Sequence, residues 1–107
     1  MSELAKRAIA CKHWRWMEGM AVFNPDLPEI WYPRVGRERT PQHRFLLPDL
    51  TDPATLGCLL AILREVRGMC SCFETAVGWR VYSAGGTLWS QGKSEGDALV
   101  AALEAAP

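Results

Sequence analysis

Cysteine and histidine are the residues of this chain that could bind a metal or act as a nucleophile. Cys11 is two residues from His13, and Cys70 is two residues from Cys72. Three thiolates and one imidazole form a ligand set that tetrahedral zinc accepts, but zinc cysteines are usually separated by about two to four residues in a turn. A single intervening residue in a strand places both sulfurs on one face instead. We therefore expect no metal site, and we expect these cysteines and Cys58 to pack as small apolar side chains.

The sequence also gives little support for nucleophilic catalysis. It contains no C-x-x-C pair and no local Ser/His/Asp signature. His43 lies in an arginine-rich stretch without a carboxylate held beside it. We therefore predict a protein that is not an enzyme, with no catalytic residue and no cofactor.

The most distinctive surface feature is the segment 31–44. Four arginines fall within its last eleven residues, and Glu38 is the acidic residue among them. Arginine beside aromatic residues is typical of protein interaction hot spots and of single-stranded nucleic-acid grooves. The predicted binding residues are Trp31, Tyr32, Arg34, Arg37, Arg39, His43 and Arg44. The alternative is a solvated loop whose charges only keep the protein soluble.

Tryptophans form the second group of candidate contact residues. Trp14 and Trp16 flank Arg15 in a stretch expected to leave the first helix, and we expect at least one of them to be exposed and to contact a partner. Trp79 and Trp89 fall in a predicted hairpin, where we expect them to pack in the core.

A central helix over 53–67 is the element against which the others are placed. Asp52 is a good N-cap, and Pro53 suits the first helical position, where its missing N–H costs no hydrogen bond. Apolar residues then recur at helical spacing and form one stripe. Gly68 is placed to end the helix.

Shorter helices and strands complete the expected fold. Helices are predicted over 3–12 and 95–105, the second capped by Ser94 with Asp97 three residues later. Gly85 and Gly86 supply a hairpin turn. Strands are predicted over 20–23, 29–35, 45–47, 69–75, 79–82 and 87–90. This order predicts one α+β domain over 1–107, with an antiparallel sheet and three helices packed on it.

Composition limits the classes of function. The formal net charge is +0, which argues against a dedicated nucleic-acid binder. No segment approaches the roughly 20 apolar residues of a membrane span. The first residues lack the apolar core of a signal peptide, so we expect reduced thiols and a cytoplasmic location.

Three stretches in the second half resemble a known family. They are DLTDPATLGCLLAILREV, the hairpin GWRVYSAGGTLWSQG and the closing SEGDALVAALEAAP. This succession resembles the small phage and prophage proteins of the phage ABA sandwich domain family, and ACKHWRWMEGM is similar to a segment that often opens them. The resemblance implies a layered helix–sheet–helix fold and a phage or prophage origin, and it transfers no catalytic residue.

Two functional hypotheses follow from these features. The first is a phage accessory protein in the host bacterial cytoplasm that binds a host protein, or a second copy of itself, and inhibits a defence or housekeeping complex. The second is a nucleic-acid or nucleotide-binding module that uses the 31–44 segment. Neither hypothesis involves a membrane.

Overall fold

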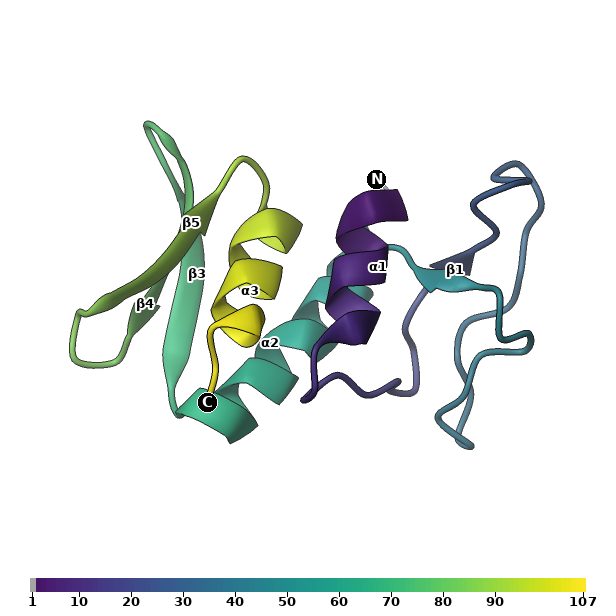
Figure 1. The fold of residues 1–107 in the computed structure, drawn as a ribbon, viewed down its shortest axis with the longest axis horizontal. Coiled ribbons are helices and arrows are strands. Elements are labelled where there is room, and N and C mark those ends of the chain that lie inside the picture. The colour runs from purple at the N-terminus through teal and green to yellow at the C-terminus, as the bar shows by residue number, and fades with distance from the viewer. Residues whose placement is uncertain (1) are drawn as a thin grey trace.

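The structure is a computed structural model that describes residues 2–107 (Figure 1). Within that range the chain forms three helices and two antiparallel sheets, one of three strands and one of two. We call these sheets the main sheet and the small sheet. The predicted α+β class, with helices packed on an antiparallel sheet, is confirmed.

Helix α2 (Pro53–Arg67) begins and ends at the predicted residues. The Asp52 carboxylate accepts the backbone N–H of Thr55 at 3.0 Å and so satisfies one of the donors that a helix start leaves free. Gly68 ends the helix with a φ of 92°, which glycine adopts without strain. Leu63 is fully buried, so the predicted apolar stripe does face the core.

The main sheet consists of β3 (Cys70–Thr75), β4 (Gly78–Ser83) and β5 (Leu88–Gly92), with β4 in the centre. All pairs are antiparallel, and β4 and β5 are joined by a turn that contains Gly86 with a φ of 88°. The predicted hairpin is therefore confirmed.

The two faces of the main sheet differ in burial. Val81 is buried on the face that helix α3 covers, whereas Phe73 and Leu88 point the other way and are about half exposed. The β4–β5 register shifts just after Val81. This bulge adds one residue to β5, and Trp89 packs against the core on the covered side. Trp79 also packs against the core, so the predicted core role of both tryptophans is confirmed.

Helix α3 (Glu95–Glu104) lies at the centre of the packing. It contacts the main sheet on one side and helices α1 and α2 on the other. Ser94 caps it as predicted, because its hydroxyl accepts the backbone N–H of Asp97 at 3.1 Å. In a full capping box Asp97 would reach back to the backbone N–H of Ser94; here its carboxylate accepts the Ser94 hydroxyl instead, at 2.6 Å.

Helix α1 (Ser2–Ala10) packs on α3 through small residues. Ala5 and Ala8 are buried in that contact. The helix ends two residues before the predicted Lys12, because the N–H of Cys11 bonds to the carbonyl of Ala8 in a tighter turn.

The small sheet pairs β1 (Val22–Phe23) with β2 (Leu47–Pro48). The strands predicted over 20–23 and 45–47 exist in shorter or shifted form. The strand predicted over 29–35 is wrong. Pro33 has no N–H to donate. Ile30 bonds to Leu27 in a local turn, and Val35 bonds to Gly19 and Met20, so no ladder with another strand forms.

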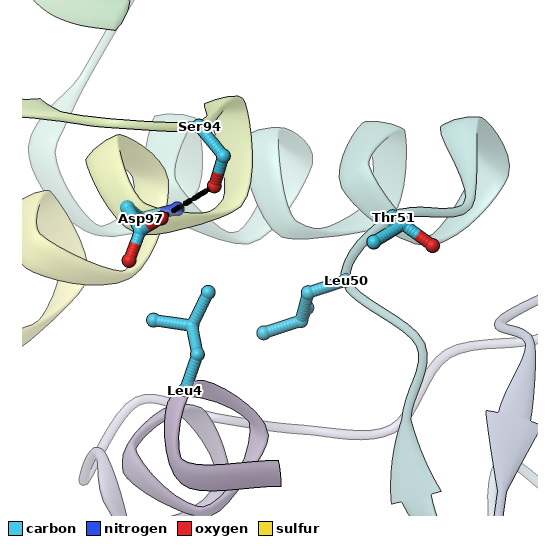
Figure 2. Close-up of a pocket in the computed structure, with 5 residues that line it drawn as sticks. All are labelled: Leu4, Leu50, Thr51, Ser94 and Asp97. Atoms are coloured by element: carbon cyan, nitrogen blue, oxygen red, sulfur yellow. Dashed lines mark hydrogen bonds between the residues drawn. The ribbon is translucent and has the colours of Figure 1, made fainter. Parts of the chain in front are cut away.

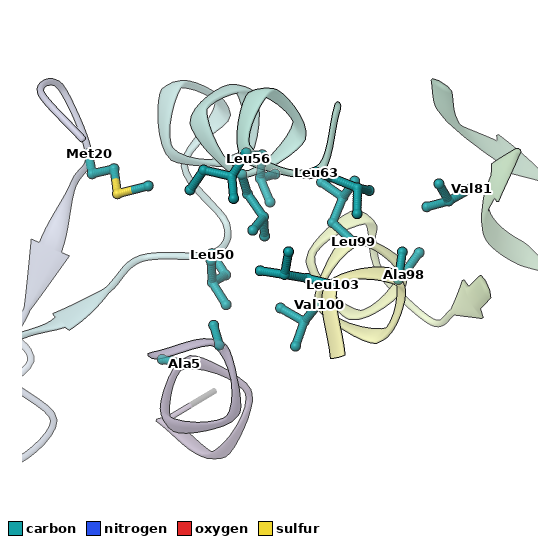
Figure 3. Packing of buried hydrophobic residues seen from close by; sticks show 14 of the residues in the cluster. Ala5, Met20, Leu50, Leu56, Leu63, Val81, Ala98, Leu99, Val100 and Leu103 are labelled. Carbon is teal, nitrogen blue, oxygen red and sulfur yellow. The ribbon is translucent and has the colours of Figure 1, made fainter. Parts of the chain in front are cut away.

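The helices lie between the two sheets, with the main sheet at one end of the molecule and the small sheet toward the other (Figure 1). The core is continuous across this arrangement: Leu63 of α2 and Leu99 of α3 point toward one another, and Val81 of β4 reaches α3 from the far side (Figure 3). All three helices lie on one face of the main sheet. This layer order differs from the helix–sheet–helix order that the family resemblance implies.

Candidate binding surface

The segment between β1 and β2, residues 24–46, forms an irregular lobe beyond the small sheet (Figure 1). Its backbone is attached to the rest of the domain near its midpoint. There the N–H of Val35 donates to the carbonyl of Met20 at 2.9 Å, and the carbonyl of Val35 accepts the N–H of Gly19 at 2.8 Å. Leu46 is buried at its end. Irregular segments of this length inside a compact domain are uncommon and usually functional. We refer to residues 24–46 as the lobe.

Arg34 is a predicted contact residue whose guanidinium is engaged by other parts of the domain, although its side chain stays 52% exposed. Its guanidinium donates two hydrogen bonds to Asp52, at 2.7 and 2.9 Å, and one to the carbonyl of Gly19 at 3.0 Å. We call this pair of bonds between the guanidinium of Arg34 and the carboxylate of Asp52 the Arg34–Asp52 fork. It holds the pKa of the Asp52 carboxyl well below its usual range, and hydrogen bonds from Thr55 act in the same direction. Arg34 therefore fastens the lobe to the start of α2.

Three apolar side chains stand on the first half of the lobe. Trp31 is 81% exposed, and Leu27 and Ile30 are 45% and 43% exposed. Successive turns fix the backbone at two of them, because the N–H of Leu27 bonds to the carbonyl of Asn24 and the N–H of Ile30 bonds to the carbonyl of Leu27. Three exposed apolar side chains within five residues of one another are costly in water, and such a concentration is typical of a contact surface.

An aromatic cluster closes the second half of the lobe. His43 and Phe45 stack with ring centroids 5.1 Å apart and planes 6° apart. Tyr32 meets both rings edge-on, at 6.0 and 6.4 Å. Phe45 is 51% exposed and belongs to this surface, although the sequence pattern predicts it as part of a strand. Its position directly before buried Leu46 was the available signal, since alternate residues of an extended chain face opposite sides.

The remaining arginines of the lobe are exposed. Across residues 2–107, Arg37, Arg39 and Arg44 form no ion pair within 4.0 Å. Arg39 has a φ of 57°, an unusual value for a residue other than glycine, in a turn closed by its N–H on the carbonyl of Gly36. The lobe therefore combines apolar, aromatic and cationic groups within one segment.

Trp14 and Trp16 do not behave as predicted. Their rings meet edge to face, with centroids 5.4 Å apart, and both pack half-buried against the core. The chain between them is not a strand, and neither side chain is fully exposed. They are therefore weaker candidates for a partner contact than Trp31.

A pattern that the prediction of a non-enzyme overlooked runs from Gly92 to Gly96. The five residues read G-x-S-x-G and lie at a strand-to-helix turn, which is the setting of a hydrolase nucleophile. A Cβ on Gly92 would lie 2.7 Å from the backbone nitrogen of Ala98, and one on Gly96 would lie 2.9 Å from the carbonyl oxygen of Leu50. Close packing around α3 therefore accounts for both glycines.

Ser94 borders an open pocket of about 300 Å³ that Leu4, Leu50, Thr51 and Asp97 also line (Figure 2). Its φ of −130° is ordinary extended backbone, and its hydroxyl is engaged by Asp97 both as donor and as acceptor. Histidine, the usual base for such a serine, does not line the pocket; His13 instead contacts the carbonyl of Pro107 at 2.7 Å. The arrangement is that of a helix cap.

The cysteines are also placed for packing. Burial raises the pKa of all four thiols, that of Cys72 to about 11, which keeps them protonated at neutral pH. Among the described residues no group of three or more His, Cys, Asp or Glu is placed to hold a metal ion. Nor, within residues 2–107, is any helix long and apolar enough to cross a bilayer.

Comparisons of the chain with protein family models, with curated proteins and with solved structures found no match. The resemblance to the phage ABA sandwich domain family therefore stays a prediction.

Proposed function

We propose that this chain is a non-enzymatic accessory protein of a phage or prophage that binds a host protein through the lobe. The observation that carries this proposal is Trp31, which is 81% exposed on a segment fastened to the domain by the Arg34–Asp52 fork. Because the segment that carries Trp31 is fastened, its backbone loses less conformational freedom on binding than a free loop would, which favours affinity.

The composition of the lobe fits a protein partner. Tryptophan, tyrosine and arginine are the residue types that most often dominate the binding energy of protein interfaces. Leu27 and Ile30 would enter an apolar depression of the partner together with Trp31. Arg37 and Arg39 would contact an acidic rim around it.

Nucleic acid is the second candidate ligand. The stacked His43 and Phe45 rings next to Arg44 have the composition of a base-stacking platform. Asp26 and Glu29, however, are exposed within the five residues before Trp31, and their charges would repel a phosphate backbone. This charge distribution favours a protein.

The test is capture of partners from a bacterial lysate by the immobilised chain, with and without nuclease, quantified by mass spectrometry. A host protein that survives nuclease and is depleted about tenfold or more by Trp31→Ser supports the proposal. Arg37→Glu with Arg39→Glu should also deplete it, and added salt should weaken the wild-type contact more than that of the reversed variant.

Lys6→Glu is the matched control, because Lys6 is an exposed cation on α1, away from the lobe. It should leave capture unchanged. Captured material that disappears with nuclease would move the assignment to nucleic acid. A partner retained equally by Trp31→Ser and by the double reversal would refute the lobe as the binding surface.

A further inference from the structure

The face of the main sheet that the helices leave uncovered is a second surface, at the opposite end of the molecule from the lobe (Figure 1). Strand alternation and the observed register place its side chains, which are Ser71, Phe73, Arg80, Tyr82, Leu88 and Gln91. Phe73 and Leu88 are 48% and 45% exposed. We call this surface the outer face.

Arg80 lies at the centre of the outer face, opposite Phe73 on one neighbouring strand and Gln91 on the other. Its guanidinium reaches the hydroxyl of Tyr82 at 3.3 Å, and its Nε is buried without a hydrogen-bond partner. Of the side chains within residues 2–107 that form this face, none is acidic. The guanidinium of Arg80 therefore has no acidic partner on the outer face.

Two aromatic rings lie beside Arg80. Phe73 and Tyr82 stack with centroids 5.3 Å apart and planes 13° apart. The face thus presents a strip of exposed apolar and aromatic side chains with one positive charge in its middle. Sheets in globular domains normally bury such a face under another layer.

The dimensions of the strip select its occupant. Three strands spaced by about 4.8 Å make a surface about 14 Å wide, and strands of five or six residues make it about 17–20 Å long. One α-helix of about 12 residues is 10–12 Å across and about 18 Å long. A stable dimer buries about 800 Å² on each partner, which is roughly three times the area of the outer face. A second copy would also place Arg80 opposite a face that carries no acidic side chain.

We infer that the outer face docks an amphipathic helix of a partner protein, with the apolar stripe of that helix over Phe73 and Leu88 and an acidic side chain of it paired with Arg80. The partner helix would supply the layer that this chain lacks on that side. The inference concerns a different surface from the lobe and stands or falls independently of it.

The test uses a displayed library of amphipathic helices of about 15 residues. The apolar stripe is kept, and one central position next to it is varied among Glu, Gln and Lys. The probe is panned against the purified full chain. Glu-bearing helices should be enriched on the wild type, and Arg80→Glu should reverse the preference to Lys-bearing helices. Phe73→Ser or Leu88→Ser should weaken binding about tenfold or more.

Leu27→Ser on the lobe is the matched control, since Leu27 is exposed to the same extent as Leu88, 45%, and should not change binding. Circular dichroism confirms that each variant is folded. The inference is overturned if no helix binds the wild type better than the Phe73→Ser, Arg80→Glu double variant, or if Glu- and Lys-bearing helices are enriched equally. Self-association and oligonucleotide binding of the wild type are measured as well. If Phe73→Ser abolishes either of them, the outer face binds a second copy or a nucleic acid, and the inference is overturned.

Discussion

Replacing Asp52 by alanine should destabilise the protein by about 2–4 kcal/mol. The carboxylate caps α2 through the N–H of Thr55, and loss of such a cap costs about 1 kcal/mol. It also accepts the Thr55 hydroxyl at 3.0 Å, and that hydroxyl in turn accepts the N–H of Ala21 at 2.8 Å. Thr55 is fully buried, so its hydroxyl loses an acceptor that water cannot replace, at about 1–3 kcal/mol.

Asp52→Asn separates the two hydrogen bonds from Thr55 from the ion pair between Asp52 and Arg34. The amide oxygen can accept both bonds from Thr55, and asparagine is as good an N-cap as aspartate. What is lost is the charge that faces Arg34, whose side chain is 52% exposed and therefore well solvated without it. The asparagine variant should lie within about 1 kcal/mol of the wild type.

The same carboxylate gives a pH dependence of known sign. The pKa of Asp52 is lowered in the folded protein by Arg34 and Thr55, so its contribution is complete above the unfolded value of about 4 and is lost as pH falls below it. The wild type should therefore lose more stability than Asp52→Asn between pH 6 and pH 2. Glu65 and Glu104, whose pKa values are also lowered by arginine partners, are present in both proteins and cancel in the comparison.

Urea unfolding followed by tryptophan fluorescence measures these differences. With a slope of about 1–3 kcal/mol/M, the alanine variant should unfold at a urea concentration about 1 M or more below the wild type. If Asp52→Ala lies within about 0.5 kcal/mol of the wild type, the network does not support the helix start. If Asp52→Asn is as damaging as Asp52→Ala, the charge rather than the acceptor is what matters, and the assignment is wrong.

Three further predictions concern the core and the thiols. Leu63→Ala should cost about 2–5 kcal/mol in the same assay, because the side chain is fully buried between α2 and α3; a loss below about 1 kcal/mol would contradict that packing. Gly92→Ala should lower the melting temperature by several degrees, since the new Cβ would lie 2.6 Å from the Cβ of Asp97, and an unchanged melting temperature would show that the β5–α3 junction yields freely. The Cys72 thiol, with a pKa of about 11, should react with iodoacetamide at pH 8 far more slowly than a free thiol, and mass spectrometry showing rapid labelling of the folded protein at this site would refute its burial.

The ends of the helices could be predicted from the sequence where their signals are local. Asp52 and Gly68 bound α2, and Ser94 begins α3, as predicted. Each of these residues interacts with backbone groups only a few positions away. A short stretch of sequence therefore contains both the capping residue and the groups that it caps. The hairpin at Gly86 follows the same logic, because the freedom to adopt a positive φ without strain belongs to glycine itself.

The candidate site was predictable only in part. Trp31, Arg37 and Arg39 are exposed, as an irregular polar segment should leave them. Arg34 has the same type of neighbours in sequence but is bound to Asp52, eighteen residues further along the chain. The strand predicted over 29–35 is absent from the described structure because a strand needs a partner for its backbone, and no local signal shows whether folding will bring one.

Alternation along β3, β4 and β5 divides the main sheet into two faces, and this much is a property of the sequence. Both faces carry apolar side chains, Val81 on one and Phe73 and Leu88 on the other, so the pattern alone does not separate the face that α3 covers from the face left open. The tertiary structure decides this, because a helix can cover only the face toward which its connection from β5 turns, and α3 turns over Val81. The hydrophobic pattern identifies the side chains that are unfavourable in water. Only the packing of segments distant in sequence determines which of them are buried within the chain.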